Sequence, residues 1–256
     1  MRHAHGDMGT RVRQITISAL ATLLFLVGAW VEGKPVSADD AQDARQLVEK
    51  ARLTLDNFQA DPQMGPSVRA LVGKAKGVMI YPQVLRGAFL FGGKGGRGVF
   101  LTRNQETNTW AGPAFYALGE ASVGLQAGAD AAEVVLVALT DRGVTALLTD
   151  SAKLGVNASV AAGPVGAGWE AATANLSADL VSYSRNQGLY AGVSIEGAGV
   201  FSQPKLDQAY YGRPVTPIQI LIQREVSNPH AGGLIAAVAR VAGGSAAIPS
   251  AIAAAK

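Results

Sequence analysis

The stretch "FLFGGKGGRGVFL", residues 89–101, decides the fold, because its glycines are open to two interpretations. One is a dinucleotide-binding loop, in which the spacing G-x-G-x-x-G follows a strand and begins a helix. A strand does precede the glycines, as "GAFLF" (87–91), but "GVFLTR" (98–103) places Val, Phe, Leu and Thr in a row, which favours a second strand. The glycines that satisfy the spacing are Gly93, Gly95 and Gly98.

The other phosphate-binding signature fails on the same stretch. A P-loop would need Gly in place of Ala88 and Ser or Thr in place of Gly95. Glycine also supplies the positive φ values that a hairpin loop needs. The sequence therefore predicts a glycine-rich β-hairpin, with Lys94 and Arg97 at its tip, and no nucleotide site.

The N-terminus has the three parts of a secretory signal peptide. A charged lead is followed by the apolar run "ITISALATLLFLVGAW" (15–30) and by Val-Ser-Ala at 36–38, which is typical of a cleavage site. The run is short for a membrane span, which needs about 20 residues. We expect residues 1–38 to be a signal peptide and the protein to be exported, periplasmic or attached to the cell envelope. An uncleaved anchor is the alternative.

The remaining 218 residues are close to neutral, with 18 basic and 17 acidic side chains. The high isoelectric point of the whole chain therefore does not predict nucleic-acid binding. Cysteine is absent, so no disulfide supports the fold. The length predicts a single domain over 39–242, and the Ala-rich end, 243–256, is a low-complexity tail.

Hydrophobic periodicity predicts an α+β fold. The sheet is expected to be mainly antiparallel and barrel- or sandwich-like, with flanking N- and C-terminal helices. Helices are predicted at 39–61, 66–77, 141–155, 216–226 and 229–242. Besides the hairpin, strands are predicted at 77–82, where Pro82 would end the strand, and at 132–140, and further hairpins at 156–174 and 180–200.

The side chains of most catalytic and metal sites are missing after residue 38. His230 is the one histidine there, and no G-x-S-x-G segment exists, so a zinc site, a catalytic triad and a cofactor are not expected. The chain is predicted not to be an enzyme. Carboxylate pairs stay open, because Glu120, Asp130 and Glu133 lie close in sequence, although solvation of the surface is the simpler explanation.

One segment is strongly basic on an otherwise neutral chain. No acidic residue lies between Asp61 and Glu106, and aromatic residues alternate with the cations. Such a segment can dock on an anionic lipid surface, each cation contributing about 1 kcal/mol. The alternative is that the charges are spread over several faces and only keep the protein soluble. The cations are Arg69, Lys74, Lys76, Arg86, Lys94, Arg97 and Arg103.

Several segments together resemble the SYLF domain family, over about 44–234. The segments are "KGVMIYPQVLRGAFLFGGKGGRGVFL" (76–101), "SVGLQAGAD" (122–130), "LGVNASVAAGPVG" (154–166), "YSRNQGLYAGVSIEGAGV" (183–200) and "YYG" (210–212). The resemblance implies binding of phosphoinositides and other anionic phospholipids, and it implies no catalytic residue. Fungal relatives are implicated in actin binding, which is not expected of an exported chain, and the SH3 partner domain of eukaryotic relatives is not found in this sequence.

The resemblance and the basic segment together predict an anionic phospholipid membrane surface as the partner. Lys94 and Arg97 are expected to contact the headgroup, and Phe89 and Phe91 are expected to pack in the core rather than insert. Two alternatives stay open: a structural or adhesive envelope protein that binds a protein partner, and a carrier or hydrolase of small molecules. The expected supporting cations are Lys74, Lys76, Arg86 and Arg103.

Overall fold

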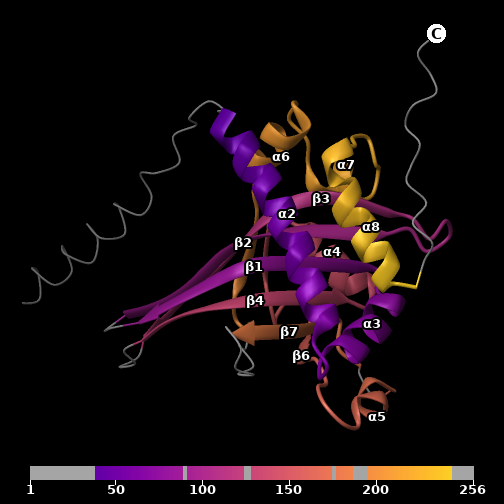
Figure 1. The fold of residues 1–256 in the computed structure, drawn as a ribbon. Helices are drawn as coiled ribbons and strands as arrows, with labels where there is room; N and C mark the ends of the chain where they lie inside the picture. Colours follow the sequence, from indigo (N-terminus) through magenta and orange to yellow (C-terminus); the bar gives the residue numbers. More distant parts are fainter. Residues whose placement is uncertain (1–37, 89–90, 124–127, 175–176, 187–194, 244–256) are drawn as a thin grey trace, which may run out of the picture. The chain divides into compact units, whose positions relative to one another are not determined.

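The computed structural model describes residues 38–88, 91–123, 128–174, 177–186 and 195–243. These residues belong to one compact unit, 36–256. Within them the chain forms one eight-stranded sheet, seven α-helices and one short 3-10 helix (Figure 1). The predicted α+β class is confirmed. The proposed leader up to residue 37, the tail from 244 on, and Phe89 lie outside the described residues.

The strands and helices have the following bounds. The strands are β1 (Gly77–Ala88), β2 (Phe91–Arg103), β3 (Trp110–Val123), β4 (Gly128–Ala138), β5 (Ser151–Lys153), β6 (Val160–Ala162), β7 (Leu180–Asn186) and β8 (Gly199–Ser202). The helices are α2 (Ala38–Ala60), α3 (Gly65–Lys74), α4 (Asp141–Leu148), α5 (Trp169–Ala174), α6 (Pro204–Tyr211), α7 (Pro217–Leu221), the 3-10 helix η1 (Pro229–Ala231) and α8 (Gly232–Val241).

The sheet is curled, and its strand order shows why. The order is β5-β8-β3-β2-β1-β4-β7-β6, and every pairing except β6–β7 is antiparallel. In a flat sheet the two edge strands would lie about 34 Å apart. Only residues 154–159 join β5 to β6, and so short a link spans at most about 25 Å. The edges must therefore approach each other, and the bridge between Leu154 and Ala158 lies in that link.

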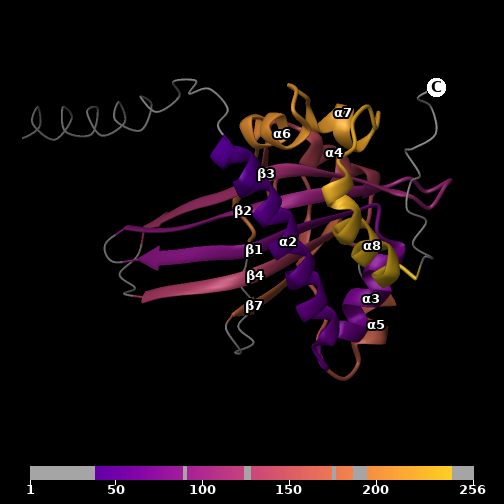
Figure 2. The same cartoon turned by 45° about the horizontal axis from the view of Figure 1, so that its top comes forward.

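Both faces of the sheet are buried along 78–81 of β1 and 134–138 of β4, which explains why these segments are apolar throughout. Along β1, Val78 and Ile80 belong to the core cluster that includes residues of α2, α3, α6 and α8, whereas Met79 and Tyr81 belong to a second cluster with residues of α4 and α7. Successive side chains of a strand point to opposite faces. We call the first the outer face and the second the inner face (Figure 2).

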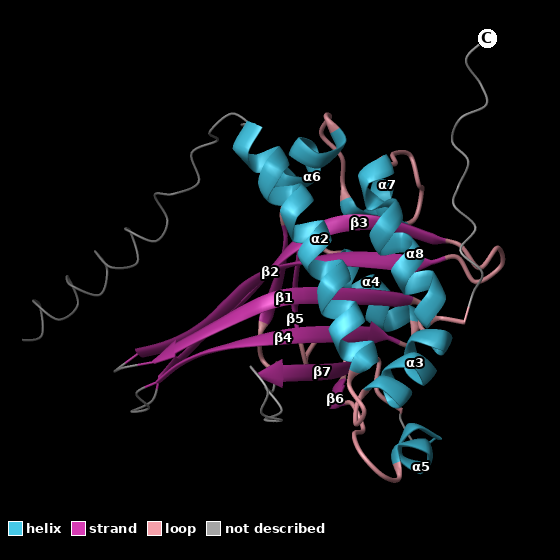
Figure 3. Cartoon of the chain, viewed as in Figure 1, coloured by secondary structure: helices cyan, strands magenta, loops and turns pink. Residues whose placement is uncertain are grey.

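Helix α2 crosses the outer face of β1 and β2 (Figure 3). Its buried side chains fall at spacings of three and four residues, as predicted for 39–61. The helices predicted at 66–77 and 229–242 and the strand at 132–140 are confirmed, although α3 ends at Lys74. The buried residues of α2 are Ala44, Val48, Ala51, Thr54, Leu55 and Phe58.

The hairpin of residues 77–103 exists, but its glycines are not in the turn. Pro82 does not end β1, because the strand continues through a bulge between Ile80 and Gln83. Gly98 lies inside β2, where an added Cβ would stand 2.5 Å from the Ile80 carbonyl oxygen and from the Tyr81 ring. Glycine is needed there because the bulged strand and its aromatic side chain approach closely. Residues 89–90 lie outside the described residues.

The hairpins predicted at 156–174 and 180–200 are wrong. In the first, β6 pairs in parallel with β7, and 169–174 forms α5. In the second, β7 pairs with β4 and β8 pairs with β3, so the two strands lie in different halves of the sheet. Period-2 patterns indicate strands but not their partners. Helix α6, which starts at Pro204 and ends at Gly212 with φ 73°, was not predicted.

Candidate binding surfaces

The six predicted headgroup residues do not form one patch. Arg86 and Lys94 are direct partners in the β1–β2 register near the turn, whereas Gly77 pairs with Thr102 at the opposite end. Nine residues of strand, about 30 Å, separate these two ends. Arg97 pairs with Gln83 between these ends. Both Arg97 and Lys94 therefore lie within β2 and not at the tip of the hairpin. The residues at the opposite end are Lys74, Lys76 and Arg103.

Two cations of the opposite end hold the structure together. Lys76 forms an ion pair with Asp141 at the start of α4. Arg103 donates to the Asn108 side chain at 2.7 Å and to the Gly73 carbonyl oxygen at 2.8 Å. The second bond satisfies a carbonyl near the end of α3, where helical partners are missing. Their charges are therefore partly committed to folding.

Two further cations at this end are exposed and uncompensated. Lys74 lies in the last turn of α3 and Arg240 in the last turn of α8. The two helix ends adjoin, because an added Cβ at Gly73 would stand 3.8 Å from the Ala242 carbonyl oxygen. Among the described residues neither cation forms an ion pair. We call the surface formed by Lys74, Lys76, Arg103 and Arg240 the α3–α8 end.

Sequence reasoning missed Arg240, because α8 lies far along the chain from the basic segment. The signal available was weak: a basic residue in the last turn of a predicted helix is usual, since it complements the negative end of the helix dipole. Only packing of α8 beside α3 turns it into a neighbour of Lys74.

The other end of the β1–β2 ladder is balanced in charge. In register, Glu120 of β3 pairs with Lys94, Lys94 with Arg86, and Arg86 with Asp130 of β4. Four charged positions thus form one row across four strands, in the order negative, positive, positive, negative. By register position, each cation has an acidic residue on one neighbouring strand and the other cation on the next. The segment is free of acids in sequence, but the acids of β3 and β4 lie beside it in space.

The same register separates two of the carboxylates considered for catalysis. Glu120 and Asp130 stand three strand spacings apart, about 14 Å, which is too far for a pair that shares one substrate bond. Glu133 lies apart from both, against α2. Its Oε1 accepts bonds from Thr54 at 3.0 Å and Asn57 at 3.1 Å, and Arg185 lies 3.7 Å from Oε2.

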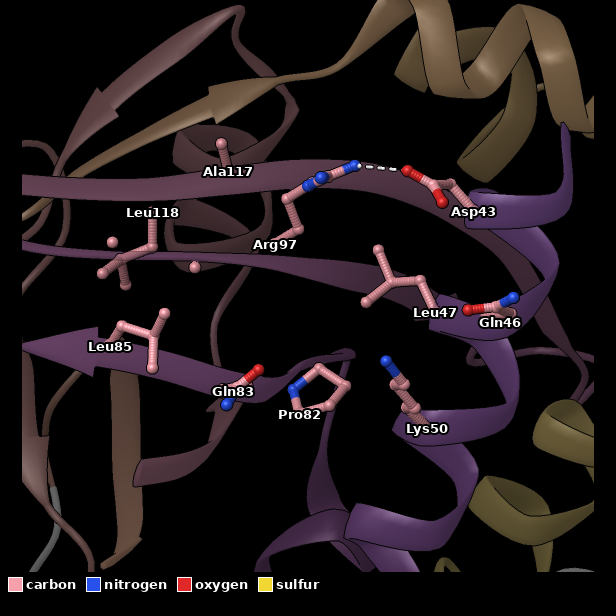
Figure 4. Close-up of a pocket in the computed structure, with 12 residues that line it drawn as sticks. Asp43, Gln46, Leu47, Lys50, Pro82, Gln83, Leu85, Arg97, Ala117 and Leu118 are labelled. Carbon is pink, nitrogen blue, oxygen red and sulfur yellow. Dashed lines mark hydrogen bonds and ion pairs between the residues drawn. The ribbon is translucent and has the colours of Figure 1, made fainter. Parts of the chain in front are cut away.

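Arg97 lies on the outer face and contacts α2. Its guanidinium is 3.2 Å from the Asp43 carboxylate, and both side chains are about half exposed. This pair borders a cavity of about 470 Å³ between α2 and the sheet (Figure 4). A second cavity of about 490 Å³ shares Lys50, Pro82 and Gln83 with the first. We call the two together the α2 groove.

Asp207 of α6 is fully buried and has a structural role. The Phe115 amide donates to its Oδ1 at 3.0 Å, next to the point where β8 ends. The carboxylate thus supplies an acceptor to β3 where the ladder has no further residue. Burial raises the pKa of Asp207 to about 8. Among the described residues its Oδ2 has no hydrogen-bond partner.

His230 also has partners that explain it. Its Nδ1 lies 3.3 Å from the Tyr210 hydroxyl and its Nε2 lies 3.6 Å from Glu49. In the part of the chain that the structure describes, no group of three or more His, Cys, Asp or Glu side chains could hold a metal ion. Across the same residues, none of the helices has the length and apolar character required to cross a bilayer.

Known proteins match this chain over most of the described unit. The family model "Ysc84: Las17-binding protein actin regulator" matches residues 119–241. Protein YSC84 of Saccharomyces cerevisiae is 34% identical over 183 residues, which cover 70% of this chain and 38% of the yeast protein. Human SH3 domain-containing YSC84-like protein 1 is 29% identical over 153 residues, covering 59% of this chain and 44% of the human protein.

A second yeast relative, LAS seventeen-binding protein 3, is 34% identical over 171 residues, 65% of this chain and 36% of that protein. The chain therefore spans less than half the length of each of these relatives. The family model begins within β3 and ends with the last residue of α8. This chain belongs to the Ysc84 family, whose domain is also called SYLF.

Proposed function

We propose that this chain is a non-enzymatic binding domain that docks on anionic phospholipid headgroups through its α3–α8 end. The observation that carries the proposal is the pair Lys74 and Arg240, two exposed cations without ion pairs, at adjoining helix ends. Each cation close to an anionic bilayer contributes about 1 kcal/mol of attraction. At the other end of the ladder the cations at 86 and 94 have acidic register partners, so less charge is available there.

The family supports a binding role in general. The family description names Las17 binding and actin regulation, and the yeast relative is named as a Las17-binding protein. Residues 1–38 are proposed to export the chain, which would bring it to envelope phospholipid instead of actin. Mass spectrometry of the protein that accumulates in cells tests this, because removal of the leader leaves residue 39 at the N-terminus.

Vesicle co-sedimentation tests the lipid proposal. Protein purified from cells that express the full chain is mixed with phosphatidylcholine vesicles, or with vesicles that also contain phosphatidylglycerol, at low and high salt. We expect binding to the anionic vesicles alone, weakened by salt because the charges are exposed. Lys74→Glu/Arg240→Glu should weaken binding at least about tenfold.

A matched control carries the same change of charge elsewhere. Lys153 and Lys205 are exposed and lie on β5 and α6, and Lys153→Glu/Lys205→Glu should leave binding nearly unchanged. Equal loss in both double variants would show that only net charge matters. Loss confined to Lys94→Glu/Arg97→Glu would return the contact to the residues that the sequence predicted. Failure of the wild type to bind any vesicle would overturn the proposal.

A protein partner is the second candidate function, favoured by exposed apolar side chains at α7. Ile218 lies on α7 and Ile222 is its C-terminal cap, and 48% and 50% of their surfaces are exposed. Neighbouring exposed apolar side chains can form part of a protein contact. In this case cross-linking in cells should trap a partner that Ile218→Ser/Ile222→Ser loses and Lys74→Glu/Arg240→Glu keeps.

A further inference from the structure

The first cavity of the α2 groove has an apolar wall. Its first cavity, of about 470 Å³, is walled by Leu47 of α2 and Leu85 of β1 (Figure 4). Gly95 and Gly96 of β2 line it without side chains, so the space beside the helix stays open. Leu85 is 56% exposed, an unusual position for a leucine on a strand beside a core. Burial of such a side chain by a ligand is favourable by the hydrophobic effect.

The charges around the groove are paired, with one exception. Arg97 is 3.2 Å from Asp43 at one border, and Arg185 is 3.7 Å from Glu133 at the other. Lys50 lines both cavities between these pairs. Among the described residues it forms no ion pair and no side-chain hydrogen bond. The groove therefore presents one net positive charge, at its middle.

Neutral polar groups accompany this charge. Gln83 lines both cavities, as Lys50 does. It follows Pro82 at the bulge of β1. Beyond Lys50 the second cavity is lined by Thr54, Asn57 and Glu133 together with Leu53, Ala131 and Ala132.

We propose that the α2 groove binds one long-chain fatty acid, with its carboxylate at Lys50 and its chain between Leu47 and Leu85. A ligand with one negative charge matches the one uncompensated cation, whereas a phosphate dianion would bring a surplus charge close to Asp43 and Glu133. A cavity of about 470 Å³ lies within the range of small-molecule sites. This site is separate from the α3–α8 end, so the protein would hold a single lipid molecule independently of docking on a bilayer.

Calorimetric titration with dodecanoate, below its micelle-forming concentration, tests the proposal on protein purified from cells that express the full chain. We expect one site per chain and binding of the uncharged analogue dodecanol at least about tenfold weaker. Lys50→Gln should weaken dodecanoate binding to the level of dodecanol and leave dodecanol binding unchanged. Lys205→Gln, the same change on an exposed cation outside the groove, should have no effect.

A second pair of variants tests the place of the chain. Gly95→Leu puts a side chain into the cavity without strain, because its Cβ would stand 3.5 Å from the nearest atom, the Leu118 carbonyl oxygen. It should abolish binding of both ligands. Gly232 at the start of α8 does not line the groove, and an added Cβ there would meet nothing within 4 Å. Gly232→Leu should therefore bind normally.

The outcomes separate this proposal from vesicle docking. The fatty-acid site is overturned if dodecanoate does not bind, if Lys50→Gln binds it as tightly as the wild type, or if Gly95→Leu still binds. Lys74→Glu/Arg240→Glu should lose vesicles and keep dodecanoate, and Gly95→Leu should do the reverse. Either proposal can therefore fail while the other holds.

Discussion

Asp207 couples the fold to pH through a single buried carboxyl. Its folded pKa of about 8 lies above the ordinary value of 3.8 that the unfolded chain presents. The folded state therefore keeps a proton that the unfolded state releases between about pH 4 and pH 8. Stability contributed by this group is present below about pH 4 and is lost progressively as the pH rises toward 8.

Asp207→Asn should remove this dependence and keep the bond to the Phe115 amide, because the Asn side-chain oxygen is also an acceptor. In the wild type, the free energy of unfolding should fall between pH 5 and pH 8, by an amount of the order of a few kcal/mol. In the variant it should be nearly constant over the same window. Urea denaturation at a series of pH values measures both, and parallel curves for the two proteins would contradict the role of Asp207.

Two glycines of one strand should respond differently to a side chain. Gly98→Ala brings a Cβ within 2.5 Å of the Ile80 carbonyl oxygen and the Tyr81 ring, so we expect a loss of roughly 1–3 kcal/mol from crowding. Gly95→Ala meets only an ordinary contact at 3.5 Å and should change stability by less than about 1 kcal/mol. Denaturant midpoints of the two variants give the comparison. A similar loss in both would mean that strand propensity, not close approach, sets the cost.

At the residue scale, the residue types indicated a strand correctly but did not show what each glycine contacts. The glycine run was correctly separated from a nucleotide loop, because the residues after it favour a strand. Its role was misassigned, because positive φ and close packing both require glycine, and only the contact of Gly98 with Tyr81 distinguishes them. The row of charged positions from Glu120 to Asp130 could not be predicted, because it depends on the register of three strand pairs.

At the scale of elements, Arg103 ties α3 to the end of β2. It was predicted to support a lipid headgroup, but its guanidinium donates to Gly73 and Asn108. Arg103→Ala should cost roughly 1–3 kcal/mol, because a helix-end carbonyl loses a charged donor. Lys74→Ala, one residue beyond Gly73 and exposed, should cost almost nothing. Thermal or urea unfolding tests this, and equal stability of both variants would show that Arg103 is as expendable as a surface cation.

Helices with one apolar stripe were predicted well, since their pattern is local. The face of α2 and the helix at 229–242 follow directly from spacing. The strand at 180–186 was recognised as one arm of the hairpin predicted at 180–200, but β8 begins only at Gly199. The pairing was not predicted, because β7 and β8 find partners on opposite sides of β1 and β2. Strands that follow each other in sequence usually pair as a hairpin. Here they pair instead with β4 and β3, which lie nearer the centre of the sheet.

At the scale of the whole described unit, the link 154–159 should affect both edges of the sheet at once. Gly155 has φ 83°, and an added Cβ would stand 2.8 Å from Glu196. Gly155→Val should therefore strain the link, at a cost of roughly 1–3 kcal/mol. Hydrogen exchange should become faster in β5 and in β6, although they are the first and last strands of the order.

Gly166 supplies the control for this prediction. It also has positive φ, 71°, but an added Cβ would meet nothing within 4 Å. Gly166→Val should increase exchange only near its own position. Faster exchange at β6 alone in Gly155→Val would show that the two edges do not support each other.

The sequence predicted an antiparallel sheet with flanking helices, but it left a barrel and a sandwich open. Which of the two forms depends on the strands that the short link 154–159 joins, β5 and β6, being the two edges of the sheet. No local sequence pattern indicates this. The positions of the candidate cations also depend on the whole fold. Six were named from one segment, and the fold places two toward one end of the β1–β2 ladder, three at the other end and Arg97 between them.

The balanced row at one of those ends has a consequence at long range. A sequence of charges ordered negative, positive, positive, negative has neither a monopole nor a dipole along its length, only a quadrupole, whose potential decays steeply with distance. An approaching charged surface would sense the unbalanced opposite end first. If the surface is anionic, as we propose, the molecule would be oriented before contact, and high salt would screen this effect.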